Sequence, residues 1–98
     1  MSYSLAFVPS ALKDFKKQGH TAREALKKKL KERLDHPYVP KDQLKNHPQT
    51  YKIKLNAWGL RLIYEVDEAN QTLTVLAVGK RNRMEVYRLL AKRQASSS

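Results

Sequence analysis

The sequence predicts an α+β fold in which a mostly antiparallel four-stranded sheet packs against helices on one side. Apolar residues recur at every second position in residues 3–7 and again between residues 51 and 78, which is the period of a β-strand. Residues 10–36 carry apolar residues at helical spacing instead. With 98 residues, of which 41% are hydrophobic, the chain can bury one small core, so a two-domain enzyme is excluded.

The first strand is predicted near residues 3–7, and a helix of about two turns follows it. Pro9 ends the strand, and the hydroxyl of Ser10 is expected to cap the helix. Gly19 favours the end of that helix.

A second, longer helix is predicted from Thr21 to His36. Thr21 and Glu24 have the spacing of a capping box, and Pro37 disfavours helix at the residue before it. One face of this helix carries an apolar stripe at helical spacing, formed at the positions Ala22, Ala25/Leu26, Lys29/Leu30 and Arg33/Leu34. Residues 37–50 contain three prolines and are predicted to form a loop, anchored to the core by Leu44.

Three consecutive strands are predicted next. Residues 51–55 and 60–66 alternate around a turn at residues 56–59, which predicts a hairpin. Residues 72–78 are aliphatic and β-branched on both faces, as in a central strand, and Gly79 is expected to end it.

The C-terminal segment is predicted to begin with a basic loop, residues 80–83, and to continue as a helix. Asn82 and Glu85 have the spacing of an N-terminal cap, and the helix is expected to run through Val86, Tyr87, Leu90 and Ala91. Residues 1–94 are therefore interpreted as one domain and residues 95–98 as a disordered tail.

The net charge indicates a polyanionic partner. Twenty Lys and Arg residues against nine Asp and Glu residues give +11, which favours binding to nucleic acid over a merely solvated surface. Binding to a membrane surface is a weaker alternative, because the basic helices carry few bulky aromatic residues.

Several classes of function are excluded or disfavoured. The absence of cysteine excludes disulfide scaffolds, cysteine-ligated metals and cysteine nucleophiles. No apolar run is long enough for a transmembrane helix and no secretory signal is recognised, so a cytoplasmic protein is expected. The histidines, His20, His36 and His47, lack metal-ligand spacing, and neither a metal nor another cofactor is expected.

The predicted hairpin places basic residues on one face of the sheet. If the turn takes residues 56–59, Lys54 lies opposite Arg61, and Lys52 lies diagonal to Arg61 on the same face. Like charges in such positions are destabilising, whereas a bound phosphate would make them favourable. Three solvated basic residues on an open sheet face remain an equal alternative from these residues alone.

A last helix packed beside that face would add Arg81 and Tyr87 to the basic residues. Charge stabilisation by preorganised cations is a large term in phosphodiester cleavage. A free tyrosine has a pKa of about 10 and is a poor base at neutral pH. Nearby cations would lower that pKa, so the role of general base for Tyr87 depends on Arg81, Lys52 and Lys54 surrounding it. The general acid is left open between Lys52, Lys54 and Arg81, of which the arginine is a poor proton donor.

The chain resembles the RelE toxins of bacterial toxin–antitoxin modules from Tyr3 to about Arg93. The resemblance is carried by residues 51–55, 59–64, 78–81 and 85–87, and more weakly by residues 1–5, 11–13 and 26–30. It implies a microbial-RNase-like fold of the RelE/ParE superfamily and cleavage of mRNA in the ribosomal A site by attack of the 2′-hydroxyl. The implied catalytic residues are Lys52, Lys54, Arg61, Arg81 and Tyr87, and the candidate RNA-binding residues are Lys45, Lys80 and Arg83.

The resemblance also implies partners. These are a cognate RelB-like antitoxin, the ribosome with its 16S rRNA and mRNA, and operator DNA for the toxin–antitoxin complex; no membrane is among them. Two rival functions stay open: a non-catalytic RNA- or ribosome-binding module, and a toxin of the same superfamily directed at DNA gyrase.

Overall fold

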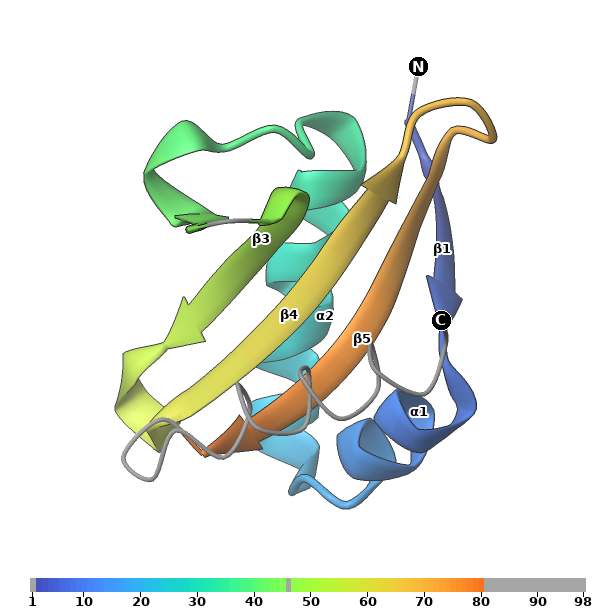
Figure 1. Ribbon diagram of the computed structural model, residues 1–98. Helices are drawn as coiled ribbons and strands as arrows, with labels where there is room; N and C mark the ends of the chain where they lie inside the picture. Colours follow the sequence, from blue (N-terminus) through green and yellow to red (C-terminus); the bar gives the residue numbers. More distant parts are fainter. Residues whose placement is uncertain (1, 46, 81–98) are drawn as a thin grey trace.

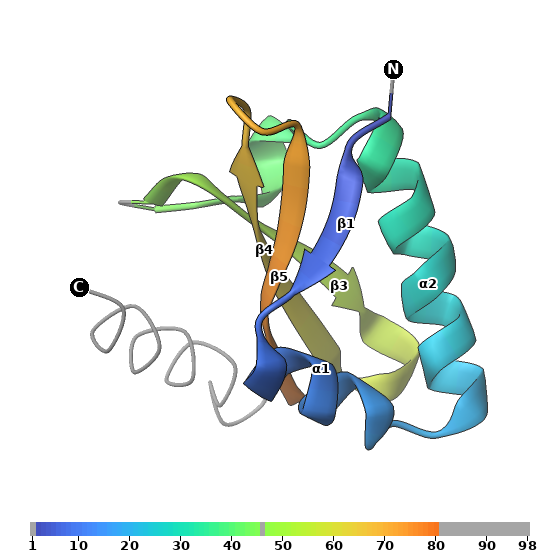
Figure 2. The same ribbon diagram turned by 90° about the vertical axis from the view of Figure 1, so that its right-hand side faces the viewer.

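The computed structural model describes residues 2–45 and 47–80, and in them a five-stranded sheet carries two helices on one side (Figures 1 and 2). The elements in chain order are β1 Ser4–Phe7, α1 Pro9–Lys16, α2 His20–Asp35, the 3-10 turn η1 Pro40–Asp42, β2 Gln43–Leu44, β3 His47–Leu55, the 3-10 turn η2 Asn56–Trp58, β4 Leu60–Asp67 and β5 Thr72–Lys80. The α+β class is therefore confirmed.

The sheet has the strand order β1-β5-β4-β3-β2. All neighbouring pairs are antiparallel except β1 and β5, which run parallel, with Ser4 opposite Thr72 and Phe7 opposite Val75. The predicted count of four strands was wrong. The additional strand β2 has only two residues, lies in the segment predicted to be a loop, and pairs with a β3 that begins at His47. Short edge strands of this kind tolerate nearby proline, which is why the prolines misled the prediction.

The core lies between the sheet and the two helices. Phe15 of α1 and Leu26 and Leu30 of α2 are buried against β-strand residues such as Ile53 and Leu62. These side chains recur at helical spacing in the helices and at every second position in the strands, as predicted. β5 lies between β1 and β4, and Leu73, Val75 and Ala77 are fully buried, which confirms its central position.

The caps predicted for the first two helices were wrong, and the cap predicted at Asn82 lies outside the described residues. α1 begins at Pro9 after Val8, and α2 begins at His20 after Gly19; neither start has a side-chain cap hydrogen bond. Proline suits the first turn because it lacks an N–H that would have no partner there. The hydroxyls of Ser10 and Thr21 therefore belong to residues already inside the helix.

The prediction that Gly79 ends the strand at residues 72–78 was also wrong. Gly79 is paired with Arg61, and β5 continues to Lys80, which is paired with Leu60. The cross-strand ladder overrides the low β-propensity of glycine. The predicted C-terminal helix, the domain end at residue 94 and the tail at 95–98 lie outside the described residues.

The β3–β4 turn depends on a left-handed glycine. Gly59 follows η2 with φ 62° and ψ 28°, and its N–H donates to the carbonyl of Asn56. A Cβ at Gly59 would meet no atom within 4 Å, so the cost of a side chain is conformational only. We expect Gly59→Ala to lower the free energy of unfolding by about 1–2 kcal/mol and Gly59→Asn by less, as measured by urea denaturation. An unchanged stability in Gly59→Ala would contradict the left-handed conformation.

Candidate functional site

The β3–β4 register brings three of the predicted site residues onto one face of the sheet. Lys54 is opposite Arg61, Ile53 is opposite Leu62 and Lys52 is opposite Ile63, which confirms the predicted hairpin pairing. Because side chains alternate along a strand, Lys52, Lys54 and Arg61 lie on the face away from the helices, here called the open face. Directly opposed Cβ atoms are about 5 Å apart, so Lys54 and Arg61 are close neighbours on this face.

The three cations differ in exposure. Lys54 is exposed, Lys52 is half-buried and Arg61 is buried, with 8% of its surface accessible. The Nη1 group of Arg61 donates to the carbonyl of Leu60 at 2.9 Å. The ion pairs within residues 2–45 and 47–80 are Arg33–Asp42 and Lys27–Glu24, so no carboxylate in that part of the chain neutralises Arg61. A buried guanidinium in this situation favours an anionic ligand.

An apolar patch borders the cations on the same open face. Ile63 and Ala77 are buried there, and Leu44 and Leu76 pack against them. Leu44 is thus an anchor for the segment that precedes β3, as predicted, although it packs on the open face and not in the core between sheet and helices. Through this contact, the loop that carries Lys45 is held beside β3.

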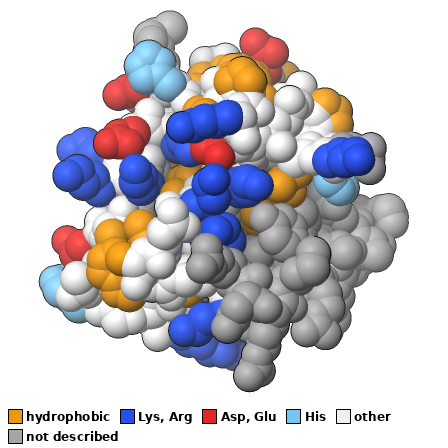
Figure 3. All heavy atoms as spheres, turned by 90° about the vertical axis from the view of Figure 1, so that its left-hand side faces the viewer, with side chains coloured by type: hydrophobic (Ala, Val, Ile, Leu, Met, Phe, Trp, Pro, Cys, Tyr) orange, Lys and Arg blue, Asp and Glu red, His pale blue; other side chains and the backbone are white. Residues whose placement is uncertain are grey.

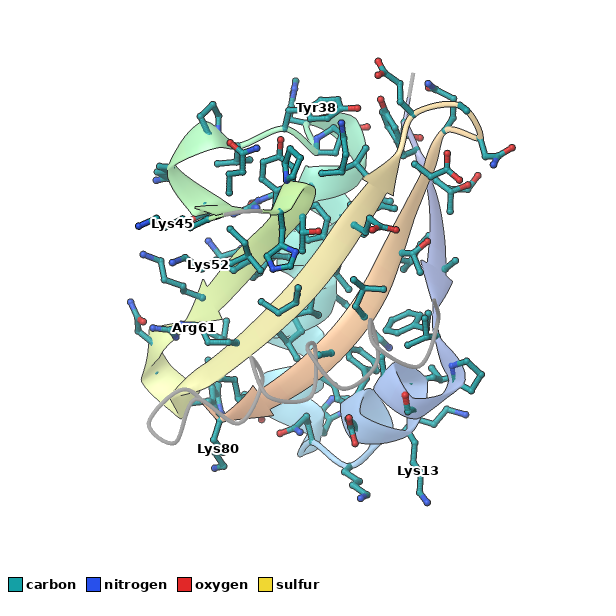
Figure 4. The ribbon with its side chains drawn as sticks, viewed as in Figure 1. Lys13, Tyr38, Lys45, Lys52, Arg61 and Lys80 are labelled. Carbon is teal, nitrogen blue, oxygen red and sulfur yellow. The ribbon has the colours of Figure 1, made fainter. Side chains whose placement is uncertain are left out.

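Lys45 and Lys80, which were predicted to bind RNA, lie in different parts of the structure. Lys45, Lys52 and Arg61 follow one another along the side of the molecule that carries β2 and β3, whereas Lys80 points away at the end of β5 (Figure 4). Figure 3 shows Lys and Arg side chains gathered on that β3 side of the molecule. Lys80 is paired with Leu60, so its side chain starts on the helix side of the sheet, opposite to the open face.

A buried polar network that the sequence did not identify holds the backbone of Lys52. Arg33 of α2 donates from Nη2 to Oδ2 of Asp42 at 2.7 Å, and from Nη1 to the hydroxyl of Tyr64 at 2.8 Å and to the carbonyl of Lys52 at 3.3 Å. The hydroxyl of Tyr64 donates in turn to the carbonyl of Pro37 at 2.7 Å.

The network joins α2, the 37–42 segment and both hairpin strands next to the cations. Burial raises the pKa of Tyr64, which outweighs the lowering by Arg33, so the phenol remains a donor at neutral pH. The available signal was the position of Arg33 in the apolar stripe of its helix, because an arginine there is rarely buried without a partner.

The remaining site residues, Arg81, Arg83 and Tyr87, lie outside the described residues, so their roles stay predictions. His20 begins α2, His36 follows it and His47 begins β3; the last was predicted in a loop. In the described part of the chain, no cluster of three His, Cys, Asp or Glu residues is arranged to hold a metal ion. None of the helices described is long and apolar enough to cross a membrane.

Comparisons with known proteins show which family the chain resembles. Residues 5–85 match the family described as the ParE toxin of the type II toxin–antitoxin system parDE. The chain is 46% identical over 93 residues to the Escherichia coli protein named mRNA interferase toxin RelE, and equally to mRNA interferase RelE of Shigella flexneri; the match covers 95% of this chain and 98% of each relative.

Solved structures of E. coli RelE also match this chain. A double arginine-to-alanine mutant of E. coli toxin RelE in the free state matches with a TM-score of 0.87 and 44% identity, covering 95% of this chain and 98% of that one. RelE in the intact E. coli RelBE toxin–antitoxin complex matches with a TM-score of 0.79 and 44% identity, over 81% of this chain and 96% of that one.

Proposed function

Since the chain belongs to the RelE family of toxins from type II toxin–antitoxin systems, we propose that it is an mRNA interferase, an endoribonuclease that cuts mRNA in the ribosomal A site and so inhibits translation. The observation that supports this most directly is the register of β3 and β4, which sets Lys52, Lys54 and Arg61 on one face. The identity of 46% to proteins named mRNA interferase extends over nearly the whole chain.

The chemistry proposed for this site is attack of a 2′-hydroxyl on the adjacent phosphodiester. Lys54 and Arg61 bind the scissile phosphate from two neighbouring strands and stabilise the charge that develops on it, which needs no reorganisation if the cations are held in advance. Lys52 adds a third charge diagonal to Arg61. Tyr87 acts as general base and Arg81 stabilises the leaving oxygen, both by the resemblance to the family.

The ribosome is proposed to supply the geometry of the substrate. The described site offers positive charge but no histidine pair for proton transfer, so much of the acceleration is expected from holding the mRNA in line for attack. Cleavage of a free oligonucleotide as fast as of mRNA on programmed ribosomes would contradict this part of the proposal. A ribosomal substrate also places the protein in the cytoplasm.

The proposed partner that controls the toxin is a RelB-like antitoxin. RelE of E. coli has been solved with RelB and with a RelB peptide, and a toxin with a net charge of +11 suits an acidic partner that steers toward its basic face. The complex, like other toxin–antitoxin pairs, is proposed to bind operator DNA.

The test of the function is primer extension on mRNA translated in a purified system, with wild type and Tyr87→Phe. Wild type is expected to produce new 5′ ends within the A-site codon. Tyr87→Phe is expected to slow cleavage by about 10²–10⁴-fold, the usual contribution of a general base, with ribosome binding unchanged in a sedimentation assay.

The two rival functions give other outcomes. A non-catalytic ribosome-binding module would block translation without new 5′ ends, and Tyr87→Phe would then change nothing. A gyrase-directed toxin would leave the mRNA intact and inhibit DNA supercoiling. Because the matching family is described as ParE toxin, the experiment includes the gyrase-directed toxin as an alternative. The joint presence of Lys52, Lys54 and Arg61 favours the nuclease.

A further inference from the structure

A pocket outside the proposed catalytic face lies between the start of α2 and the β3–β4 turn. Its volume is about 400 Å³, and the residues that line it include Gln18, His20, Thr21, Trp58, Leu60 and Lys80. The three segments that meet there are the α1–α2 connection, η2 and the end of β5. The pocket thus combines one large aromatic ring, a lysine and several polar side chains.

The pocket adjoins the basic open face around the end of the sheet. Leu60 and Lys80 are paired, and the next pair along the two strands is Arg61 and Gly79. Because consecutive residues point to opposite faces, Arg61 faces the open side and the pair Leu60–Lys80 faces the pocket. The open face and the pocket therefore meet at the start of β4, where Leu60 and Arg61 are consecutive residues.

We propose that this pocket binds one nucleobase of the single-stranded RNA whose phosphates lie on the open face, with the base stacked on Trp58 and an adjacent phosphate at Lys80. The inference rests on the proposed function, because it assumes an RNA substrate. In this proposal, Trp58 and Lys80 bind the RNA next to the position that is cleaved, and they take no part in the chemical step.

Trp58 has the properties of a stacking surface. It is one of the exposed large hydrophobic residues, with 39% of its surface accessible, and it belongs to a turn held by the left-handed Gly59. An indole that is exposed at a pocket can stack on any base, because every base has a π-face. The neighbouring hydroxyl of Thr21, imidazole of His20 and amide of Gln18 offer donors and acceptors to the edge of a base.

The charge of the pocket selects a ligand with a phosphate. Lys80 is exposed at its rim, and none of the described residues that line the pocket is acidic. The ion pairs of the described chain, Arg33–Asp42 and Lys27–Glu24, do not involve Lys80. This lysine is therefore available for a phosphate, which it binds as a point charge.

The sequence provides its own probe for the test, because Trp58 is the only tryptophan. The complete chain is titrated with a single-stranded RNA hexamer carrying 2′-O-methyl groups, which cannot be cleaved by 2′-hydroxyl attack, and the fluorescence of Trp58 is recorded. We expect saturable quenching. A hexamer of the same length with abasic positions is expected to bind about tenfold more weakly, because stacking is lost, and to leave the fluorescence nearly unchanged.

Variants separate the pocket from general electrostatics. Lys80→Ala is expected to weaken the binding of the hexamer several-fold, whereas Lys13→Ala, which removes an exposed lysine of α1 away from the pocket, has a much smaller effect. Trp58→Leu is expected to weaken binding of the normal hexamer about tenfold in an anisotropy assay, and Trp58→Phe, which keeps an aromatic ring, much less. The Trp58→Leu variant should bind the abasic hexamer no more weakly than it binds the normal hexamer, and no more weakly than wild type binds the abasic hexamer.

Three outcomes would overturn the inference. These are equal quenching by the abasic hexamer, binding of the hexamer by anisotropy with unchanged Trp58 fluorescence, and no binding at all. Primer extension with the same protein preparation keeps the two proposals apart. Normal cleavage without a Trp58 response rejects only the pocket, whereas absent cleavage with base-dependent quenching rejects the nuclease and retains an RNA-binding protein.

Discussion

Arg61→Met is expected to lower the single-turnover rate of mRNA cleavage on programmed ribosomes by about 10²–10³-fold, the usual cost of removing one preorganised group that stabilises a transition-state charge. The stability of the protein should respond in the opposite sense. Arg61 is buried opposite Lys54, and removing one of two like charges in a cross-strand pair is expected to raise the free energy of unfolding by up to about 1 kcal/mol. Urea denaturation measures that change.

The control for Arg61→Met is Lys28→Met, which removes one positive charge from an exposed position of α2. It should change neither quantity appreciably. If Lys28→Met slowed cleavage as much as Arg61→Met, only the net charge would matter, and the assignment of a site on the open face would be wrong. A marked loss of stability in Arg61→Met would show that the arginine has a structural role instead.

Arg33→Met is expected to destabilise the protein by about 3–5 kcal/mol, because it leaves the carboxylate of Asp42 buried without its ion-pair partner. Only 5% of the Asp42 side chain and 14% of the Arg33 side chain are accessible, and their atoms are 2.7 Å apart. The same change removes the donors to the Tyr64 hydroxyl and to the Lys52 carbonyl. The loss is measured as a shift of the urea unfolding midpoint.

A double-mutant cycle tests whether the buried pair is the cause. Arg33→Met combined with Asp42→Leu should recover part of the stability lost in Arg33→Met alone, because the uncompensated charge is then absent. Additive losses would place the effect in the packing of α2 instead. The exposed pair Lys27–Glu24 serves as the comparison, and Lys27→Met should change the stability little.

The parts of the fold that the sequence predicted correctly are those determined by periodicity. The pairing of Lys54 with Arg61 follows from a four-residue turn and alternating apolar positions, since a shift by one residue would turn every core side chain to the other face. β2 and the parallel β1–β5 pair were not predicted. A two-residue strand has no period, and the pairing of distant strands is decided by tertiary packing.

The candidate site was predicted only where it depends on local strand pairing. Lys52, Lys54 and Arg61 could be placed from local pairing alone, whereas Lys80 was expected in a basic loop and is instead the last residue of β5. The partners of Arg33 could not be inferred, because Tyr64 is 31 residues away in the sequence and Asp42 lies beyond the end of the helix, in the segment predicted to be a loop. The pocket beside Trp58 was missed because segments that are distant in the sequence form it: the α1–α2 connection, η2 and the end of β5.

The parallel pairing of β1 with β5 has a consequence for biosynthesis of the protein. The first strand to leave the ribosome has Thr72–Val75 as its partner, so nearly the whole chain must be made before the sheet is complete. Contacts between such distant segments are slow to form. While the chain is being synthesised, the edge strand β1 therefore waits without its partner until residues 72–75 have left the ribosome.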